Sequence, residues 1–330
     1  MSGVTVIVPV YNAEQYLEEC IVSITQELHD CDELILLNDG SKDNSLRICE
    51  KYVAHNIHII DNSNQGVSAT RNCGIQRATC DYLTFVDADD YLLEGWRDII
   101  EQGINKGTDI VFFSKESDYM PTRQELVDNI LFLPTKRKLS IRAGACWYKL
   151  FKKNFIEERE IMFEKNIING EDGLFCLAAV LNTLNYGVVK SKNFYFYRHN
   201  PSSATHKYTD RYNESNRKYI KTVELLLKMH TSMPLLDIKE SIDFIQIRGL
   251  YILANRIASI KEISERKSKY SLFEQPEYLE LYKNYIPSKK CSRIVKDTFF
   301  LLKKGKYDKA IKIINRRRRV RLLLRRVVKR

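Results

Sequence analysis

The sequence has no run of about 18 apolar residues, the length that predicts a membrane-spanning helix. Its first residues, MSGVTVIVPV, lack a basic segment ahead of their short apolar stretch, which argues against a signal peptide. Cysteines spaced as CxxC or CxxH are also missing, because the eight cysteines are scattered along the chain. We therefore expect reduced, mostly buried thiols in a cytosolic protein rather than disulfides or a zinc site.

Acidic residues are absent from positions 316–330, which hold nine Lys or Arg. Removing these nine charges from the formal net charge of +11 leaves +2, so the basic character belongs to this tail. The sequence has no internal repeat, and the tail is its only biased segment. A chain of 330 residues suffices for one large domain or two ordinary ones.

Segments typical of strands and helices alternate along the first part of the chain. β-branched apolar runs such as VTVIVPV indicate buried parallel strands, whereas Leu17, Ile21 and Ile24 recur at helical spacing. The predicted strands are 4–10, 33–39, 57–61, 82–87 and 109–113, and the predicted helices are 13–26, 43–56, 67–79 and 96–106. This alternation predicts right-handed βαβ units and an α/β fold with a mostly parallel sheet flanked by helices.

The pattern changes further along the chain. Residues 169–182 are typical of a loop entering a helix, and 185–200 alternate like the strands of a hairpin. From about 207 the pattern is helical to the end. We therefore expect a first domain over 1–207, with halves that meet near residue 115, and a helical region over 208–330 that ends in the basic tail 316–330.

Polar residues directly follow four of the predicted strands: Tyr11-Asn12, Asp39-Gly40-Ser41, Asp61-Asn62 and Asp87 to Asp90. Ligands of open parallel sheets bind beyond the carboxyl ends of the strands. The sequence therefore predicts a binding site at one edge of the sheet.

Three carboxylates, Asp87, Asp89 and Asp90, crowd the end of the predicted strand YLTFVD. Each raises the cost of ionising its neighbours, so we expect either a cation or open water beside them. Carboxylate oxygens suit Mg²⁺ or Mn²⁺, whereas zinc prefers Cys and His. Taken alone, the triplet is equally compatible with a helix N-cap and solvated acids in a turn.

The chain resembles the family 2 glycosyltransferases of the GT-A fold, of the bacterial surface-polysaccharide type, in four segments that stand in one order: VTVIVPVYNAEQYLEECIVSI, ELILLNDGSKDNS, NQGVSATRNCGI and DYLTFVDADDYL. The likeness is close over residues 3–115 and looser at GEDGLF (170–175) and YFYRHNPSSATH (195–206). It implies an inverting, metal-dependent transfer of a sugar from a UDP-sugar to a hydroxyl. The implied acceptor is a glycan or lipid-linked molecule in the synthesis of a cell-surface polysaccharide or glycolipid.

The resemblance implies a set of nucleotide-binding residues: Pro9, Tyr11, Asn12, Asp39, Arg71, Asp87 and Ala88. In it, Tyr11 lies against uracil, Asp39 hydrogen-bonds the uracil edge, and Asp87 contacts the ribose or a metal-bound water. The residue types also allow other interpretations. Tyr11 would then plug the top of the sheet, and Asp39 would form a turn ahead of Gly40. Arg71 suits a diphosphate, a salt bridge to the acidic cluster, or both.

By the same resemblance, Mn²⁺ or Mg²⁺ binds Asp89, with His199 from a later loop as a further candidate ligand. His206 is a candidate of the same kind, and Arg198 is a candidate for contact with the diphosphate. A lone His is equally compatible with surface packing. Asp90 is expected to be structural, as a cap for the segment that follows it.

Asp172 matches the catalytic base of the family, which removes the acceptor hydroxyl proton, and Glu171 would orient the acceptor or the base. The same pair is compatible with a helix start, where acids interact favourably with the helix dipole. We expect direct displacement with inversion and no covalent intermediate. In front of this pair in the sequence, Trp147 and three lysines (149, 152 and 153) either line the acceptor cleft or, as we favour, pack in a hairpin with solvated charges.

Leucines and valines interrupt the arginines of the tail, so it can form a helix that binds an anionic bilayer surface weakly. We therefore expect a cytoplasmic enzyme, peripheral on the inner face of the cell membrane. Nucleic-acid binding and an inert solvated tail are rival interpretations, but the body has no nucleic-acid motif. The sequence leaves open whether the protein forms an oligomer.

Two other functions use a similar sheet. A nucleotidyltransferase normally has a Gly-rich phosphate loop after the first strand, where this chain has YNAEQY. A non-catalytic, membrane-associated scaffold of the same fold would not need the acidic positions, and all of them are present.

Overall fold

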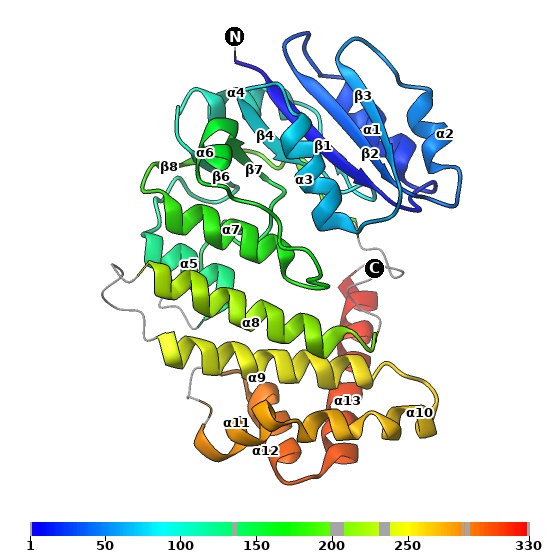
Figure 1. Cartoon of the computed structure of the whole chain (residues 1–330), viewed down its shortest axis with the longest axis vertical. Coiled ribbons are helices and arrows are strands. Elements are labelled where there is room, and N and C mark those ends of the chain that lie inside the picture. The colour runs from blue at the N-terminus through cyan, green and yellow to red at the C-terminus, as the bar shows by residue number, and fades with distance from the viewer. Residues whose placement is uncertain are drawn as a thin grey trace. The chain divides into compact units, whose positions relative to one another are not determined.

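The computed structural model describes residues 2–133, 137–198, 208–230, 238–285, 287 and 291–328, with side chains up to residue 320. The chain forms two compact units, Met1–Asn200 and Pro201–Arg330, which we describe separately (Figure 1). We predicted the boundary at 207/208. Residue 207 belongs to the stretch 199–207, which lies outside the described residues, so this boundary stays a prediction.

A seven-stranded sheet forms the centre of the first unit. Its order is β3 (Ile57–Asn62), β2 (Glu33–Asp39), β1 (Val4–Val10), β4 (Tyr82–Phe85), β7 (Lys149–Lys152), β6 (Ile110–Ser114) and β8 (Tyr186–Lys190). Neighbouring strands are parallel except for β7, which is antiparallel to both β4 and β6. Every residue of β2 is buried, as expected for a strand covered on both faces.

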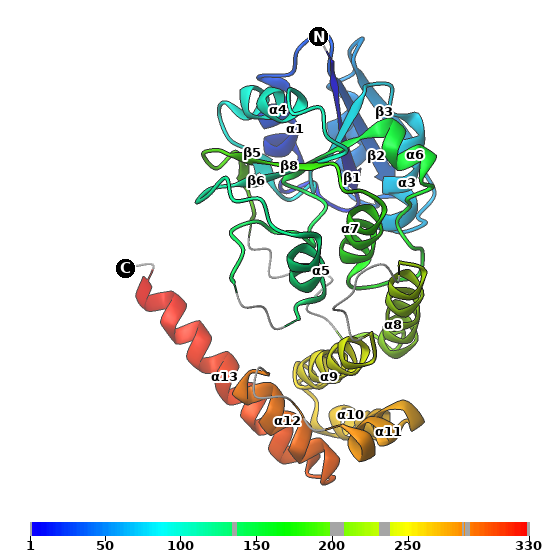
Figure 2. The same cartoon turned by 90° about the vertical axis from the view of Figure 1, so that its left-hand side faces the viewer.

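Helices cover both faces of this sheet. They are α1 (Leu17–Thr25), α2 (Ser45–Glu50), α3 (Val67–Arg77), α4 (Trp96–Ile104), α5 (Arg123–Leu131), α6 (Lys153–Glu158) and α7 (Glu171–Asn182). α1 and α4 lie on one side and α3 on the other (Figure 2). The predicted order of strands and helices is confirmed, although the predicted helix 43–56 ends at Glu50 and the predicted strand 82–87 ends at Phe85.

The hairpin predicted over 185–200 is wrong. β8 pairs in parallel with β6, whereas β9 (Tyr195–Phe196) pairs in antiparallel fashion with β5 (Tyr91–Leu92) as a separate two-stranded ribbon. Alternation of polar and apolar residues determines which side chains face inward, but it does not specify the partner strand. This ribbon carries β9 to the segment that follows β4.

The second unit is helical in its described part. Its helices are α8 (Tyr212–Met229), α9 (Ile238–Ile257), α10 (Ile263–Ser268), α11 (Pro276–Asn284), α12 (Arg293–Lys303) and α13 (Tyr307–Val328). Leu250, Leu253 and Ile257 of α9 form its core with Phe273 and Phe299. α12 and α13 form a helical hairpin that packs on α9 (Figure 1). None of the helices described in either unit is long and apolar enough to cross a bilayer.

Candidate functional site

The carboxyl ends of β1 to β4 meet at one edge of the sheet. The parallel registers align Val10 with Asn38 and Asp39 with Asn62, and they align Ile7 with Phe85. The polar segments that follow these strands therefore lie along the same edge. This topology confirms the predicted convergence.

The ends of β1 and β2 are joined through Asn12, whose φ of 49° is left-handed. Its backbone N–H donates to Ser41 Oγ at 3.0 Å, and its Oδ1 accepts from the Lys42 N–H at 2.8 Å. This turn leaves Tyr11 50% exposed, so its ring does not plug the top of the sheet. Pro9, in β1, is half-buried.

Asp39 is buried at the end of β2, where its carboxylate holds the chain ahead of α3. Oδ1 accepts from the Gln65 N–H at 2.7 Å, and Oδ2 accepts from the Gly66 N–H at 2.9 Å. The alternative of a local turn ahead of Gly40 therefore understates its role, because Asp39 joins β2 to a segment 26 residues away. Each carboxylate oxygen has a second lone pair that can accept from a ligand.

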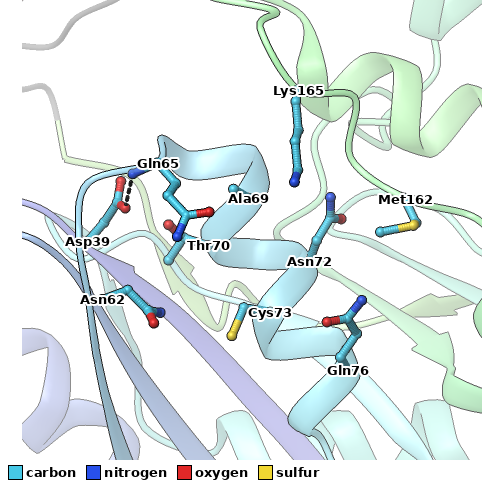
Figure 3. Close-up of a pocket in the computed structure, with 10 residues that line it drawn as sticks. All are labelled: Asp39, Asn62, Gln65, Ala69, Thr70, Asn72, Cys73, Gln76, Met162 and Lys165. Atoms are coloured by element: carbon cyan, nitrogen blue, oxygen red, sulfur yellow. Dashed lines mark hydrogen bonds between the residues drawn. The ribbon is translucent and has the colours of Figure 1, made fainter.

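A pocket of about 190 Å³ opens beside Asp39, between α3 and the loop after α6 (Figure 3). It is lined by Asp39, Asn62, Gln65, Ala69, Thr70, Asn72, Cys73, Gln76, Met162 and Lys165. Asn72 fixes the loop, because its amide exchanges hydrogen bonds of 2.9 and 2.8 Å with the Phe163 backbone. Half of the lining side chains are polar and uncharged, which suits a small polar ligand.

Arg71, on the inner side of α3, joins three acidic side chains from two other elements. Its Nη2 lies 2.8 Å from Asp87 Oδ1, and its Nη1 lies 2.6 Å from Asp172 Oδ1 and 3.6 Å from Glu171 Oε1. The Arg71 side chain is only 4% exposed. Arg71 therefore connects the end of β4 to the start of α7, as the predicted alternative of a salt bridge to the acidic cluster requires.

Burial and mutual repulsion set the charges of this cluster. Burial opposes the charge of Arg71, but Asp172, Asp87 and Glu171 more than offset it, so its pKa is raised. Burial raises the pKa of Asp87, although Arg71 counteracts part of this shift. Burial and the charge of Asp172 raise the pKa of Glu171 to about 7. Glu171 is therefore partly protonated at neutral pH.

Glu171 and Asp172 are the first two residues of α7, so the loop-to-helix transition predicted over 169–182 is confirmed. Their side chains are 17% and 22% exposed. The helix-start interpretation is compatible with their position. It does not account for Arg71, which is contributed from a helix 101 residues away along the chain.

Asp90 anchors the β5–β9 ribbon over the acidic segment. Its Oδ2 accepts from the Tyr195 hydroxyl at 2.6 Å, and its Oδ1 accepts from the Arg198 N–H at 2.7 Å. Burial raises the pKa of Asp90 to about 7. The structural role expected for Asp90 agrees with these contacts, but it caps no helix, because α4 begins only at Trp96.

Sequence reasoning missed Tyr195, whose hydroxyl also accepts from the Asp87 N–H at 3.3 Å. The only signal for it was the aromatic alternation of YFYRHN. Arg198, the candidate for diphosphate contact, donates from Nε to the Asp89 carbonyl at 2.9 Å and pairs with Glu19 at 2.6 Å. The ribbon is thus tied to the acidic segment by side chain and backbone together.

Asp89 is half-buried next to Ala88, which is 7% exposed. The carboxylates of Asp87 and Asp89 both belong to the cluster at the carboxyl edge, since each contributes to raising the pKa of Asp90 after burial. Hard oxygen donors at such a density suit a divalent cation. His199 and His206, the further metal candidates, lie outside the described residues.

Lys149 is buried, so the solvated charge that we favoured for it is wrong. Its Nζ donates to the carbonyls of Arg142 and Ala145, and burial lowers its pKa. Lys153 does remain at the surface, where it pairs with Glu157 at 2.9 Å. The hairpin expected around Trp147 is absent too, because β7 lies between β4 and β6 in the sheet.

A second group of metal-binding residue types, His29, Cys31 and Asp32, lies directly before β2, at the amino end of that strand. Asp32 Oδ1 accepts from the Val4 N–H at 3.0 Å, and Oδ2 accepts from Arg97 Nε at 2.6 Å. The charge of Arg97 neutralises this carboxylate. The group is therefore a structural anchor of the fold.

Comparison with known proteins relates the fold to a family. The model of glycosyl transferase family 2 matches residues 5–158. The uncharacterized glycosyltransferase EpsJ of Bacillus subtilis is 33% identical over 217 residues, which are 61% of this chain and 62% of that protein. The glycosyltransferase GlyA of Streptococcus pneumoniae is 29% identical over 228 residues, 63% of this chain and 32% of that protein. The chain therefore spans less than two thirds of the length of either relative.

Among solved structures, residues 1–349 of Staphylococcus aureus TarS in complex with UDP-GlcNAc align with a TM-score of 0.61 and 18% identity. The alignment covers 97% of this chain and 92% of the other. At this identity the likeness concerns the fold, and it confirms the predicted GT-A sheet followed by a helical region. The family match favours sugar transfer over the nucleotidyltransferase and scaffold alternatives.

Proposed function

We propose that this chain, whose residues 5–158 match the model of glycosyl transferase family 2, transfers a sugar from a UDP-sugar to a hydroxyl of a glycan or lipid-linked acceptor, with a divalent cation and with inversion at the anomeric carbon. The observation that carries this proposal is the Arg71 bridge. It holds Asp87, next to the expected metal ligand, and Asp172, the expected base, in one cluster at the carboxyl edge of the sheet. Sugar transfer needs both functions within the span of one sugar ring.

UDP is the proposed nucleotide. The exposed ring of Tyr11 provides a surface on which a base can stack, and Asp39 and its neighbouring pocket provide polar groups for the base or ribose edge. The similarity to a protein solved with UDP-GlcNAc supports this donor class. Pro9, Asn12 and Ala88 would shape the same edge through their backbone.

Asp89 and Asp87 would hold Mn²⁺ or Mg²⁺ by their carboxylates, Asp87 directly or through water. When bound, the ion would neutralise these acids together with the departing diphosphate. The donor set fits such an ion, because both groups are hard oxygen donors. Arg71 donates to Asp87 Oδ1, which leaves Oδ2 and the second lone pair of Oδ1 for the ion or its water.

Asp172 is the proposed base. Arg71 fixes its Oδ1, and among the described residues no hydrogen bond reaches its Oδ2, which can therefore take the acceptor proton. The acceptor oxygen forms a bond to the anomeric carbon as the bond to the diphosphate oxygen breaks, and the electron pair leaves with the diphosphate. Attack opposite the leaving group inverts the centre without a covalent enzyme intermediate. Glu171, partly protonated, can donate to the acceptor or to Asp172.

The acceptor class is proposed from the relatives. TarS is named as a poly(ribitol-phosphate) β-N-acetylglucosaminyltransferase, and it is 26% identical to this chain over 215 residues. We accordingly propose a role in bacterial surface-polysaccharide synthesis, on the cytoplasmic face of the membrane.

An anionic membrane surface is the proposed partner of the second unit. The exposed side of α13 carries Lys309, Lys312, Arg316 and Arg319 at spacings of three and four residues, before the rest of the tail begins. Three more exposed lysines precede them at the turn from α12, at positions 303, 304 and 306. Asp308 is the one acid in this stretch of 303–320, and it accepts from the Tyr270 hydroxyl at 2.9 Å. Such a surface attracts anionic lipids.

Turnover of a panel of UDP-sugars tests the proposed activity. Released UDP would be measured with Mn²⁺, with Mg²⁺ and with EDTA, and the anomeric configuration of the product would be read by NMR. We expect hydrolysis or transfer with at least one UDP-sugar, loss of activity in EDTA and a product of inverted configuration. Activity unchanged by EDTA would contradict the metal requirement, and a retained configuration would contradict direct displacement.

A further inference from the structure

Three aromatic rings form a column beside the acidic cluster. Trp147 stacks on Tyr195 with ring centroids 4.7 Å apart and planes at 16°, and on Tyr197 at 5.5 Å and 17°. Tyr195 and Trp147 are buried, whereas Tyr197 is 55% exposed. The column thus begins inside the protein and ends in an aromatic ring that faces outward.

The inner end of the column touches the catalytic cluster. The Tyr195 hydroxyl contacts both Asp90 and the Asp87 N–H. The antiparallel register of β4 and β7, with Leu83 opposite Phe151, brings the residues ahead of β7 to the carboxyl edge of β4. Trp147 therefore lies at the same edge as the acidic segment.

The outer ring is also near these acids. The backbone N–H of Arg198, the residue after Tyr197, donates to Asp90 Oδ1 at 2.7 Å, which holds this part of the chain beside the acidic segment. An exposed aromatic ring on a strand is ordinary when it stands alone. Here the Tyr197 ring packs on the buried ring of Trp147, which in turn stacks on Tyr195, and this packing fixes its orientation.

The column lies on the side of β4 away from the proposed nucleotide. In the sheet order β3-β2-β1-β4-β7, Tyr11 and Asp39 follow the strands on one side of β4, and Trp147 precedes the strand on the other. A donor sugar at Asp87 would lie between these two sides. The next sugar along, that of the acceptor, would lie toward Trp147 and Tyr197.

The chemistry of this surface suits a pyranose ring. One face of many pyranoses presents C–H groups, which pack against the negatively polarised face of an aromatic ring. The hydroxyls at the ring edge need hydrogen-bond donors and acceptors. Arg142 is exposed, with its guanidinium carbon 5.1 Å from the centre of the Trp147 ring, and its N–H groups can donate to such hydroxyls.

We propose that Tyr197, supported by Trp147 and flanked by Arg142, is the platform on which a pyranose ring of the acceptor glycan stacks. This inference rests on the proposed sugar transfer and assigns its acceptor subsite. Tyr197 is accordingly a specificity residue and takes no part in moving the proton.

The neighbouring residue provides a matched control. Phe196 precedes Tyr197 and is 40% exposed, but it stacks on Tyr91 at 4.5 Å. Successive residues of a strand point to opposite faces, so the rings of Phe196 and Tyr197 belong to different aromatic stacks. Replacing either residue by Ala removes an exposed aromatic ring from the same short strand region.

Saturation-transfer NMR with the full chain tests the platform without a known acceptor. The probes are the methyl β-pyranosides of glucose, galactose, mannose and N-acetylglucosamine, in the presence of UDP and Mn²⁺. We expect saturation of the ring protons of at least one glycoside by the wild-type protein, by Phe196→Ala and by Tyr197→Phe. Tyr197→Ala should weaken glycoside binding by about tenfold, the scale of one lost stacking contact, while the UDP signals persist.

Equal glycoside saturation by Tyr197→Ala and the wild type would overturn the proposal. It would also be overturned if the wild type saturated none of the glycosides, or if Phe196→Ala lost them as well. Missing UDP signals in all four proteins would instead contradict the proposed donor, so the two failures are distinguishable.

Discussion

At the scale of single residues, the acidic cluster depends most on Arg71, a buried cation among three carboxylates. Replacing it by Ala should lower the free energy of unfolding by about 3–5 kcal/mol, because buried acids are left without their partner. Arg71→Lys should restore only part of this stability, since one ammonium group cannot reach Asp87 and Asp172 in the geometry of a fork. Urea unfolding measures both variants.

The control for Arg71 is Arg159→Ala, which removes an exposed arginine at the end of α6. Its free energy of unfolding should stay within about 0.5 kcal/mol of the wild type. If Arg71→Ala unfolded at the same urea concentration as Arg159→Ala, the stability of the fold would not depend on the buried charge of Arg71.

Glu171 predicts how stability depends on pH. Its pKa is raised from an ordinary value of 4.5 to about 7 in the folded protein, mainly by burial and by Asp172. An acid with a raised pKa in the folded state stabilises the fold while protonated, and this contribution is lost as the pH rises through the folded pKa. The free energy of unfolding of the wild type should therefore fall between about pH 4.5 and 7, and Glu171→Gln should fall less steeply.

Unfolding measured at several pH values in that window checks this prediction. Asp90, whose pKa burial also raises to about 7, keeps part of the slope in Glu171→Gln. A steeper fall in the variant than in the wild type would contradict the assignment.

The sequence predicted which residues gather at the site better than it predicted their partners. Asp39, Asp87 and Asp172 all lie where the strand and helix ends were expected. The hydrogen bonds of Arg71 and Asp39 depend on segments that lie 16 to 101 residues away in the chain, and no local pattern encodes them. Tyr195 was missed for the same reason.

At the scale of elements, two glycines determine the position of α3, each for a different physical reason. Gly66, directly before α3, has a φ of +88° and open space where a Cβ would stand. Gly74 lies so close to β1 that a Cβ would come within 2.5 Å of Ile7 Cγ2. Gly66→Ala should cost about 1–2 kcal/mol of stability through backbone strain, and Gly74→Ala about 1–3 kcal/mol through overpacking.

A second substitution, at Ile7, should restore stability to only one of these two variants. Ile7→Ala removes the Cγ2 methyl group that a Cβ at Gly74 would meet, so it should recover part of the loss in Gly74→Ala and none of the loss in Gly66→Ala. Thermal unfolding of the single and double variants measures this. Equal recovery in both would show that the two losses have a common cause.

The strands of the first unit were predictable where the sequence indicates both the strand and its neighbour in the sheet. β1, β2 and β4 are joined to their neighbours by βαβ units, so their runs of Val, Ile and Leu indicated both the strand and its place. β7, β8 and β9 have no such connection, and their alternation fits several partners. The wrong hairpin at 185–200 follows from this ambiguity.

At the scale of the whole molecule, the basic residues of the second unit predict membrane binding. Replacing five exposed lysines of the α12–α13 hairpin by Gln, at 303, 304, 306, 309 and 312, should lower binding to phosphatidylglycerol vesicles by at least about tenfold. The same number of exposed lysines elsewhere in this unit, at 221, 239, 261, 267 and 283, provides a control with equal net charge. Vesicle flotation measures both.

The control should bind nearly as the wild type does, because its charges are not clustered along one helix. Added salt should weaken binding of the wild type. Equal loss in both variants, or equal binding to phosphatidylcholine vesicles, would contradict a specific basic surface.

The helical nature of the second unit was predictable from periodicity, but its cationic surface was recognised only in part. The tail at 316–330 was visible as a charge run. The lysines at 303–312 alternate with apolar residues, and only the burial of Ala310, Ile311 and Ile314 reveals that they share an exposed side. Helical periodicity predicts a buried stripe, whereas the position of its neighbours decides which charges remain outside.

The central claim is that Asp172 acts as the base beside a separately formed UDP site, and one pair of measurements on Asp172→Asn tests it most directly. The variant would be compared with the wild type for turnover of the preferred UDP-sugar and for UDP binding by calorimetry with Mn²⁺ present. We predict that turnover falls by about 10²–10⁴-fold while the Kd for UDP stays within about threefold. Retained turnover, or loss of UDP binding together with turnover in a folded variant, would contradict the account.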